Sequence, residues 1–258
     1  MNKTVIISGT SSGIGKELRK LFLENGDRVI SLSRTNPSGD EDFIECDLTD
    51  RQSLERAVNL IKEKCESVDM LINNSGVGLS GATELLPKDE VEKVVDLDYL
   101  GALFLTQGVL PLMKRGAKIV NISSACALFP LPYRSVYCSA KAAMNMMSYG
   151  LRMELKQSGI NVVCICPGDI KTNFTQNRIK SFETNERYGS RPKNAAEKID
   201  SREDKRMRVD KTAKKIYRIA QKKKKAMYIV GAKYKVFWFF YRILPTNLFI
   251  KIIGKIFS

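Results

Sequence analysis

Tyr137 and Lys141 stand four residues apart, a spacing that could put a proton donor beside a fixed positive charge. In a helix, residues at i and i+4 share one face. A phenol ordinarily titrates near pH 10, and a neighbouring cation favours the phenolate and lowers its pKa. The pair is therefore a candidate general acid or base. The pair is significant because of Ser124, a further polar side chain that follows an apolar run 13 residues before Tyr137.

The composition excludes much other chemistry. The 258 residues include no histidine, which excludes Ser-His-Asp and Cys-His hydrolysis, histidine-containing zinc sites and any imidazole acid or base. The six cysteines contain no C-x-x-C pair, so we expect neither a metal site nor a disulfide framework. The chain opens directly on an apolar run rather than on a signal peptide, and we expect a cytoplasmic protein.

A glycine-rich turn with the pattern G-x-x-x-G-x-G follows the first apolar run. Glycine allows a tight turn and a close approach of the backbone to a pyrophosphate, and free N–H groups at a helix N-terminus favour its negative charge. The alternative is a tight strand-to-helix turn without a ligand. The position of the turn favours a dinucleotide. The residues expected to hold it are Gly9, Ser11, Ser12, Gly13, Ile14 and Gly15.

Arg34 follows the second apolar run, where a carboxylate would ordinarily hold the adenosine ribose. Arginine is planar and permanently charged, and it suits a 2′-phosphate. The residue therefore predicts NADP rather than NAD, with a surface arginine that points into solvent as the alternative.

Short apolar runs alternate along the chain with stretches of helical period. Such runs separated by helices require crossover connections, and hence a parallel sheet covered on both faces. We therefore predict a single-domain α/β fold, a Rossmann-like doubly wound parallel sheet of about seven strands with helices on both faces. The predicted strands lie at residues 5–7, 28–32, 43–44, 70–72, 118–122, 161–165 and 227–230.

The helical stretches have recognisable ends, and two long ones are expected at about residues 88–113 and 136–157. Residues 173–210 are polar and without clear periodicity, which is typical of a segment that covers an active site. We place a nucleotide-binding domain at residues 1–231, including this cover segment, and a basic, aromatic, amphipathic tail at residues 232–258.

These motifs together resemble the short-chain dehydrogenase/reductase family, over about residues 3–172 and more weakly to about residue 231. Ser124, Tyr137 and Lys141 resemble its catalytic set. The segment Asn73-Asn74-Ser75-Gly76 resembles its N-N-A-G strand end. Beyond the glycine turn, the resemblance assigns to the cofactor the residues Asp47, Leu48, Asn73, Gly76, Tyr137, Lys141, Pro167, Gly168, Ile170 and Thr172.

The resemblance implies hydride transfer between a nicotinamide and a carbonyl or alcohol carbon. It implies that Ser124 hydrogen-bonds the substrate oxygen, that Tyr137 gives or takes its proton, and that Lys141 holds the cofactor ribose and lowers the pKa of Tyr137. Asp98 departs from the pattern, because the family usually has asparagine there as a fourth member of the catalytic set. An ionised carboxylate cannot donate a hydrogen bond, and it could pair with Lys141 and weaken its effect.

Charge is distributed unevenly. Residues 1–170 carry a net charge of −2 and residues 171–258 a net +17. Basic amphipathic helices with aromatic side chains are typical of a bilayer interface, so the tail predicts a peripheral contact with the inner face of the membrane. The alternatives are a solvated basic face, or a tail packed on the substrate mouth or on a partner subunit.

The sequence thus predicts an NADP-dependent oxidoreductase acting on a ketone, aldehyde or secondary alcohol, with a lipophilic substrate suggested by the apolar tail. The resemblance also suggests a homodimer or homotetramer. One alternative is a cofactor-binding sensor or scaffold with weak turnover, because of Asp98. Another is a nucleic-acid binder that uses the basic tail, but the chain lacks a recognisable nucleic-acid-binding module and we expect no such partner.

Overall fold

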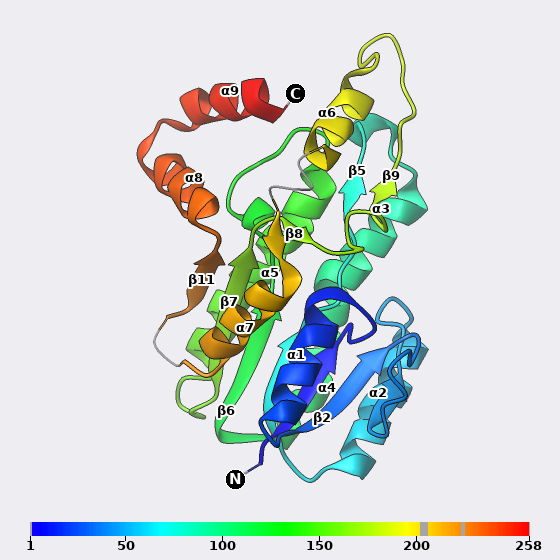
Figure 1. Cartoon of the computed structure of the whole chain (residues 1–258), viewed down its shortest axis with the longest axis vertical. Helices are drawn as coiled ribbons and strands as arrows, with labels where there is room; N and C mark the ends of the chain where they lie inside the picture. The colour runs from blue at the N-terminus through cyan, green and yellow to red at the C-terminus, as the bar shows by residue number, and fades with distance from the viewer. Residues whose placement is uncertain (1, 202–205, 223–224, 258) are drawn as a thin grey trace.

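The structure is a computed structural model that describes residues 2–201, 206–222 and 225–257 of the chain. Lys223, Lys224 and the last residue of the tail, Ser258, lie outside the described residues, as do residues 202–205 of the predicted cover segment. Within the described part, helices flank a central sheet on both faces, and the C-terminal helices extend to one side of it (Figure 1).

The central sheet consists of seven parallel strands, which coincide with the seven apolar runs of the sequence. The predicted fold class is therefore confirmed. From β1 the successive strands β2 and β3 are added on one side, and from β4 the later strands are added on the other side. The order of the strands therefore reverses between β1 and β4, and doubly wound sheets bind ligands at such a switch point. In spatial order the strands are β11 (Met227–Val230), β7 (Asn161–Pro167), β6 (Met113–Ile122), β4 (Val68–Asn73), β1 (Thr4–Ser8), β2 (Arg28–Ser33) and β3 (Phe43–Glu45).

Alternating side chains of the strands build one apolar layer on each face of the sheet. Ile6 lies opposite Ile30 and Leu71 in the neighbouring strands, and all three belong to the layer covered by α2, α4 and the end of α5. Val5 and Ile7 point the other way, into the layer covered by α1 and α7. These helices are α1 (Gly13–Glu24), α2 (Arg51–Lys64), α4 (Gly101–Val109), α5 (Ser135–Glu154) and α7 (Val209–Ala220).

The long helix predicted at residues 88–113 is interrupted. It consists of α3 (Lys88–Val95), a π-helical turn η2 (Asp96–Leu100), α4 and a 3₁₀ turn η3 (Leu110–Leu112). Single π turns within helices are frequent at functional sites. This turn contains Asp98.

The cover segment contains more regular structure than its sequence predicts. Its helix α6 (Arg191–Asp200) buries Pro192, Ala195, Ala196 and Ile199. Three of these four side chains are small or cyclic, so the apolar period is weak in the sequence. Short strands pair the segment with the rest of the site, in two two-stranded sheets formed by β8 (Ile170–Lys171) with β10 (Met207–Arg208) and by β5 (Leu79–Ser80) with β9 (Ile179–Lys180).

The tail forms two helices, α8 (Ala232–Ile243) and α9 (Thr246–Phe257), which pack on the domain. Phe249, Ile253 and Phe257 recur every four residues on α9 and are buried against Phe129 and its neighbours. A second, apolar face of the two helices stays exposed. Within the described residues, no helix is both long and apolar enough to cross a membrane.

Candidate active site

A cavity of about 820 Å³ lies at the carboxyl ends of the central strands, at the switch point between β1 and β4. It extends from the glycine turn and the end of β2 to the cover segment. Most of the residues predicted for the site line this cavity, namely Gly9, Ser11, Ser12, Gly13, Ile14, Arg34, Asp47, Leu48, Gly76, Ser124, Tyr137, Lys141, Pro167, Gly168, Ile170 and Thr172. In the described part of the chain, no group of acidic residues and cysteines is arranged to hold a metal ion.

The glycine turn has the features that a pyrophosphate requires. Gly9 and Gly13 adopt φ values of +71° and +56°, which side chains rarely adopt, so the backbone itself forms the wall of the cavity. Ser12 is the N-cap of α1, and its side chain makes no capping hydrogen bond. The N–H groups of the first turn are therefore available to an anion. The residues present fit the phosphates of a dinucleotide.

Two residues predicted for the cofactor, Gly15 and Asn73, do not line the cavity. Gly15 serves close packing instead, since a Cβ there would lie 2.0 Å from the Gly9 carbonyl oxygen. The Asn73 amide is buried and donates to Thr106 Oγ1 at 3.0 Å and to Asn121 Oδ1 at 2.8 Å. The next residue, Asn74, lines the cavity. Its side-chain amide donates to the Gly9 carbonyl oxygen at 3.2 Å and so stabilises the glycine turn.

Arg34 is exposed at the end of the cavity formed by β2. Ser33 and Thr35 flank it and also line the cavity. On the neighbouring loop, Asp47 Oδ1 accepts hydrogen bonds from both the backbone N–H and the hydroxyl of Thr49. A positive charge and two hydroxyl-bearing neighbours at this place suit a phosphate group.

Helix α5 places Tyr137 and Lys141 one turn apart on the cavity wall, and Ser124 faces them from the end of β6. The Ser124 hydroxyl accepts the Cys126 N–H at 3.2 Å. Burial raises the pKa of Tyr137, which is 4% exposed, above the ordinary value of a phenol, and the nearby Ser124 opposes the rise. That Lys141 lowers the pKa of Tyr137 stays a prediction.

Asp98, predicted as a member of the catalytic set, is fully buried behind the cavity wall rather than on it. Its Oδ1 accepts the Val77 N–H at 2.8 Å and lies 3.7 Å from Lys141 Nζ, as the predicted pairing requires. A Cβ at Gly76 would lie 2.7 Å from the same Oδ1, so the absence of a side chain there lets the carboxylate approach. Complete burial raises the pKa of Asp98 to about 6, and the Lys141 charge opposes the rise.

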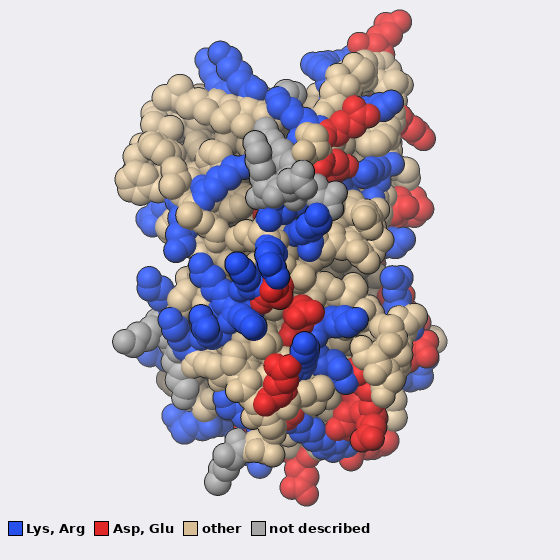
Figure 2. Space-filling model, viewed as in Figure 1, with Lys and Arg blue, Asp and Glu red and all other residues tan. Residues whose placement is uncertain are grey.

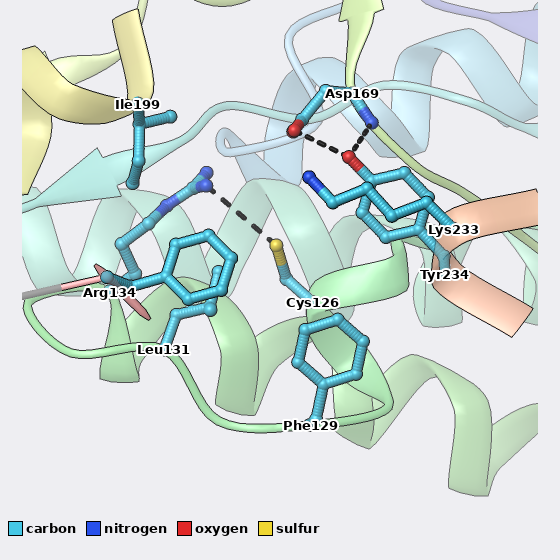
Figure 3. A pocket seen from close by; sticks show the side chains of 9 residues that line it. Cys126, Phe129, Leu131, Arg134, Asp169, Ile199, Lys233 and Tyr234 are labelled. Carbon is cyan, nitrogen blue, oxygen red and sulfur yellow. Dashed lines mark hydrogen bonds between the residues drawn. The ribbon is translucent and has the colours of Figure 1, made fainter. Parts of the chain in front are cut away.

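The tail also contributes a side chain to the site. Tyr234 of α8 lines the cavity, donates its hydroxyl proton to Asp169 Oδ2 at 2.5 Å and accepts the Asp169 N–H at 3.0 Å (Figure 3). Gly168 makes room for this ring, since a Cβ there would lie 1.8 Å from it. Sequence reasoning missed Tyr234, although the cluster of aromatic residues in the tail was a signal.

Sequence reasoning also missed two arginines, Arg134 and Arg178, which line the cavity and are 5% and 6% exposed. Arg134 precedes Tyr137 by one helical turn, and its guanidinium carbon lies 5.0 Å from the centre of the Tyr137 ring. Its charge lowers the pKa of Tyr137 and partly offsets burial. For Arg134, its position three residues before Tyr137 was a signal in the sequence, whereas Arg178 had none.

The fold and the site define a dinucleotide-binding oxidoreductase. The chain matches the short chain dehydrogenase family over residues 3–182. It is 36% identical over 179 residues to the 3-ketodihydrosphingosine reductase of Bacteroides thetaiotaomicron. The matched region covers 67% of this chain and 66% of that protein. It is 31% identical over 252 residues to a probable short-chain type dehydrogenase/reductase of Helicobacter pylori, covering 94% and 93% of the two chains. A short-chain dehydrogenase of Streptomyces avermitilis has the same fold, with a TM-score of 0.83 at 24% identity over 98% of this chain and 96% of that one.

The chain belongs to the short-chain dehydrogenase/reductase family. It is an oxidoreductase that uses a nicotinamide cofactor and acts on the CH–OH/C=O pair.

Proposed function

We propose that this protein is an NADP(H)-dependent carbonyl reductase or alcohol dehydrogenase whose substrate has an apolar body. One observation carries the proposal: Ser124, Tyr137 and Lys141 line the same cavity that Arg34 and the glycine turn line at its other end. A single cofactor could therefore reach from the phosphate-binding end to the proton donor.

Each catalytic side chain has a defined task in this mechanism. When bound, the nicotinamide supplies or accepts the hydride. Ser124 donates a hydrogen bond to the substrate oxygen. Tyr137 donates its proton to that oxygen in reduction and removes a proton from the alcohol in oxidation. Lys141, with its positive charge one helical turn away, stabilises the phenolate that this transfer leaves.

The proposed NADP preference depends on Arg34. Arginine remains charged at every physiological pH and can form two parallel hydrogen bonds to a phosphate. Arg34 lines the cavity at the end of β2, and in dinucleotide-binding folds the residue after this strand ordinarily holds the adenosine ribose, where NADP and NAD differ.

The proposed apolar substrate is supported by the side chains near the catalytic group. Phe174 and Ile179 of the cover segment line the cavity, and the Phe174 ring lies 5.9 Å from that of Tyr137. The test is a panel of ketones and aldehydes of increasing chain length, assayed with NADPH and NADH by loss of absorbance of the reduced cofactor. Turnover that rises with chain length and is faster with NADPH supports the proposal, whereas no turnover in either direction contradicts it.

The pair formed by Asp98 and Lys141 supports a second candidate, a cofactor-binding sensor or scaffold with weak turnover. An ionised Asp98 partly neutralises Lys141 and raises the pKa of Tyr137. Tight cofactor binding together with failure to reduce any member of the panel would favour this candidate.

We also propose that the tail rests on an anionic membrane surface, such as the inner face of the cytoplasmic membrane. The exposed face of α8 and α9 contains Val236, Phe239, Phe240, Ile243, Leu248, Ile250 and Ile252. The same helices present five exposed cations, which are Lys233, Lys235, Arg242, Lys251 and Lys255. In Figure 2, Lys and Arg side chains border a surface of residues without charge at this end of the molecule. Such a face combines apolar insertion with attraction to acidic lipid headgroups.

We further propose a homodimer or homotetramer in the cytoplasm, with the exposed Met146 and Met153 of α5 as candidate contacts between subunits. Analytical ultracentrifugation tests this assembly directly. A sedimentation coefficient that corresponds to a monomer at micromolar concentration would contradict it.

A further inference from the structure

The cavity wall contains two buried guanidinium groups whose role the proposed reaction does not explain. Arg134 and Arg178 are 5% and 6% exposed, and both line the cavity together with Tyr137. Arginine is almost never fully buried unless it is paired, because desolvation of a charge costs free energy. Their partners therefore indicate what the cavity is built to bind.

Arg134 has very little polar compensation within the protein. Its Nη1 donates to the Cys126 thiol at 3.8 Å, its guanidinium lies over the Tyr137 ring, and its buried Nε has no partner. Among the described residues, no carboxylate forms an ion pair with Arg134. The nearby Asp169 is engaged by the Tyr234 hydroxyl, as Figure 3 shows.

Arg178 has an ion-pair partner, but it shares that partner with other cations. Its Nη1 lies 3.2 Å from Asp200 Oδ1, while Lys180 and Arg206 approach the same carboxylate at 2.8 and 3.8 Å. One negative charge therefore serves three positive charges in this part of the described chain. The Arg178 Nε is buried without a partner.

The two guanidiniums influence each other across the site. Burial, and secondarily the charge of Arg134, lowers the pKa of Arg178 to about 10. Phe174 lies between Tyr137 and Arg178. Its ring is centred 5.9 Å from the ring of Tyr137, and a Cβ at Gly78 would contact both Phe174 and Arg178. An anion held here would thus lie close to the proton donor.

We propose that Arg134 and Arg178 bind a carboxylate of the substrate, so that the substrate is an oxo acid or a hydroxy acid with an apolar body. Guanidinium groups match the geometry of a carboxylate through parallel N–H···O bonds, and the low exposure of both side chains strengthens this attraction. The same charges disfavour a substrate with an ammonium group near the reacting carbon. This inference rests on the proposed reductase function and assigns its substrate class.

A matched series of substrates tests the inference. Oxo acids with the ketone two to five carbons from the carboxylate are compared with their methyl esters and primary amides. We expect kcat/KM of the wild type to favour the best acid over its ester and amide by about 10- to 100-fold, as for a charge-assisted hydrogen bond. Arg134→Met and Arg178→Met should remove this preference, whereas Arg187→Met, at an exposed arginine, should keep it.

A binding measurement separates this inference from the proposed reaction. Titration calorimetry compares hexanoate, hexanamide and hexyl phosphate on the wild-type protein saturated with NADP⁺. Tighter binding of hexanoate than of the amide, lost in Arg134→Met and Arg178→Met, supports the carboxylate site even if no ketone in the series is reduced. In that case the proposed function fails and the site remains.

Three outcomes would overturn the carboxylate site. The first is equal affinity for hexanoate and hexanamide, and the second is a clear preference for hexyl phosphate. The third is a loss of NADPH affinity in Arg134→Met as large as its loss of hexanoate affinity, which would place the arginine on the cofactor. Circular dichroism verifies folding of each variant. If a Met variant does not fold, Arg134→Lys and Arg178→Lys keep the charge but lose the planar fork, and an unchanged hexanoate affinity in both would also contradict the proposal.

Discussion

Asp98 Oδ1 lies 3.7 Å from Lys141 Nζ, and both side chains are buried. The second carboxylate oxygen of Asp98 has no hydrogen-bond partner. Lys141 therefore has a carboxylate close to its charge, and in the proposed mechanism the same charge must also stabilise the Tyr137 phenolate. The balance between them should set the pH range in which Tyr137 works.

The first prediction concerns the pH dependence of alcohol oxidation. An ionised Asp98 raises the pKa of Tyr137, so Asp98→Asn should move the rise of kcat/KM to lower pH and leave the activity at neutral pH equal or higher. The measurement is the pH profile of kcat/KM with NADP⁺ and a secondary alcohol. A large loss of activity in this variant would show that the carboxylate itself is required.

Folding stability should depend on the same group. The pKa of Asp98 is raised from an ordinary 3.8 to about 6 in the folded protein, so the folded state holds the proton more tightly. This stabilisation is present below the unfolded pKa and is lost as pH rises to about 6, a change on the order of 3 kcal/mol. Relative to Asp98→Asn, the wild type should therefore lose stability between pH 4 and 6 in urea titrations. Parallel curves for the two proteins would contradict this.

Tyr137→Phe removes the proposed proton donor and keeps the shape of the ring. We expect kcat to fall by about 10²- to 10⁴-fold, the usual contribution of general acid–base catalysis, while NADPH affinity stays nearly unchanged. Steady-state kinetics and cofactor fluorescence titration measure the two effects. A variant that keeps most of its activity would exclude Tyr137 as the donor.

Arg34→Asp replaces an attractive charge with a repulsive one at the expected 2′-phosphate. NADPH binding should weaken by at least about 1.5–3 kcal/mol, and NADH should bind as well as before or better. Arg218→Asp provides the control, because Arg218 is exposed on α7 outside the cavity lining. Equal NADPH affinity in the wild type and Arg34→Asp would remove the basis for the NADP preference.

The membrane proposal requires the exposed face of the tail and not its packed face. The double variant Phe239→Ser/Ile250→Ser should lose sedimentation with anionic vesicles while its thermal midpoint stays close to that of the wild type. Phe249→Ala, on the packed face, should instead destabilise the protein by about 3–5 kcal/mol. If the wild type does not sediment with anionic vesicles, or sediments equally with neutral ones, the proposal is wrong.

Local patterns were enough to predict the sheet and much of the site. The apolar runs predicted all seven strands because buried parallel strands are continuously apolar. The glycine turn and the Tyr137–Lys141 pair could also be recognised in the sequence, because each consists of a few residues close together in the chain. Helix α6 was missed because it packs through Ala195 and Ala196, whose small side chains produce little periodicity.

The sequence by itself thus determined the sheet and the glycine turn, and it was enough to propose Tyr137 as the proton donor. The tertiary structure alone decided which neighbouring residues face the cavity, as Asn74 does and Asn73 does not. It also decided that Arg134 and Arg178, from distant segments, are buried in the wall of the cavity that Tyr137 lines, and that the tail contributes Tyr234 to the same cavity. These relationships depend on burial and on contacts between segments far apart in the chain, and pKa values follow from that surrounding rather than from residue type.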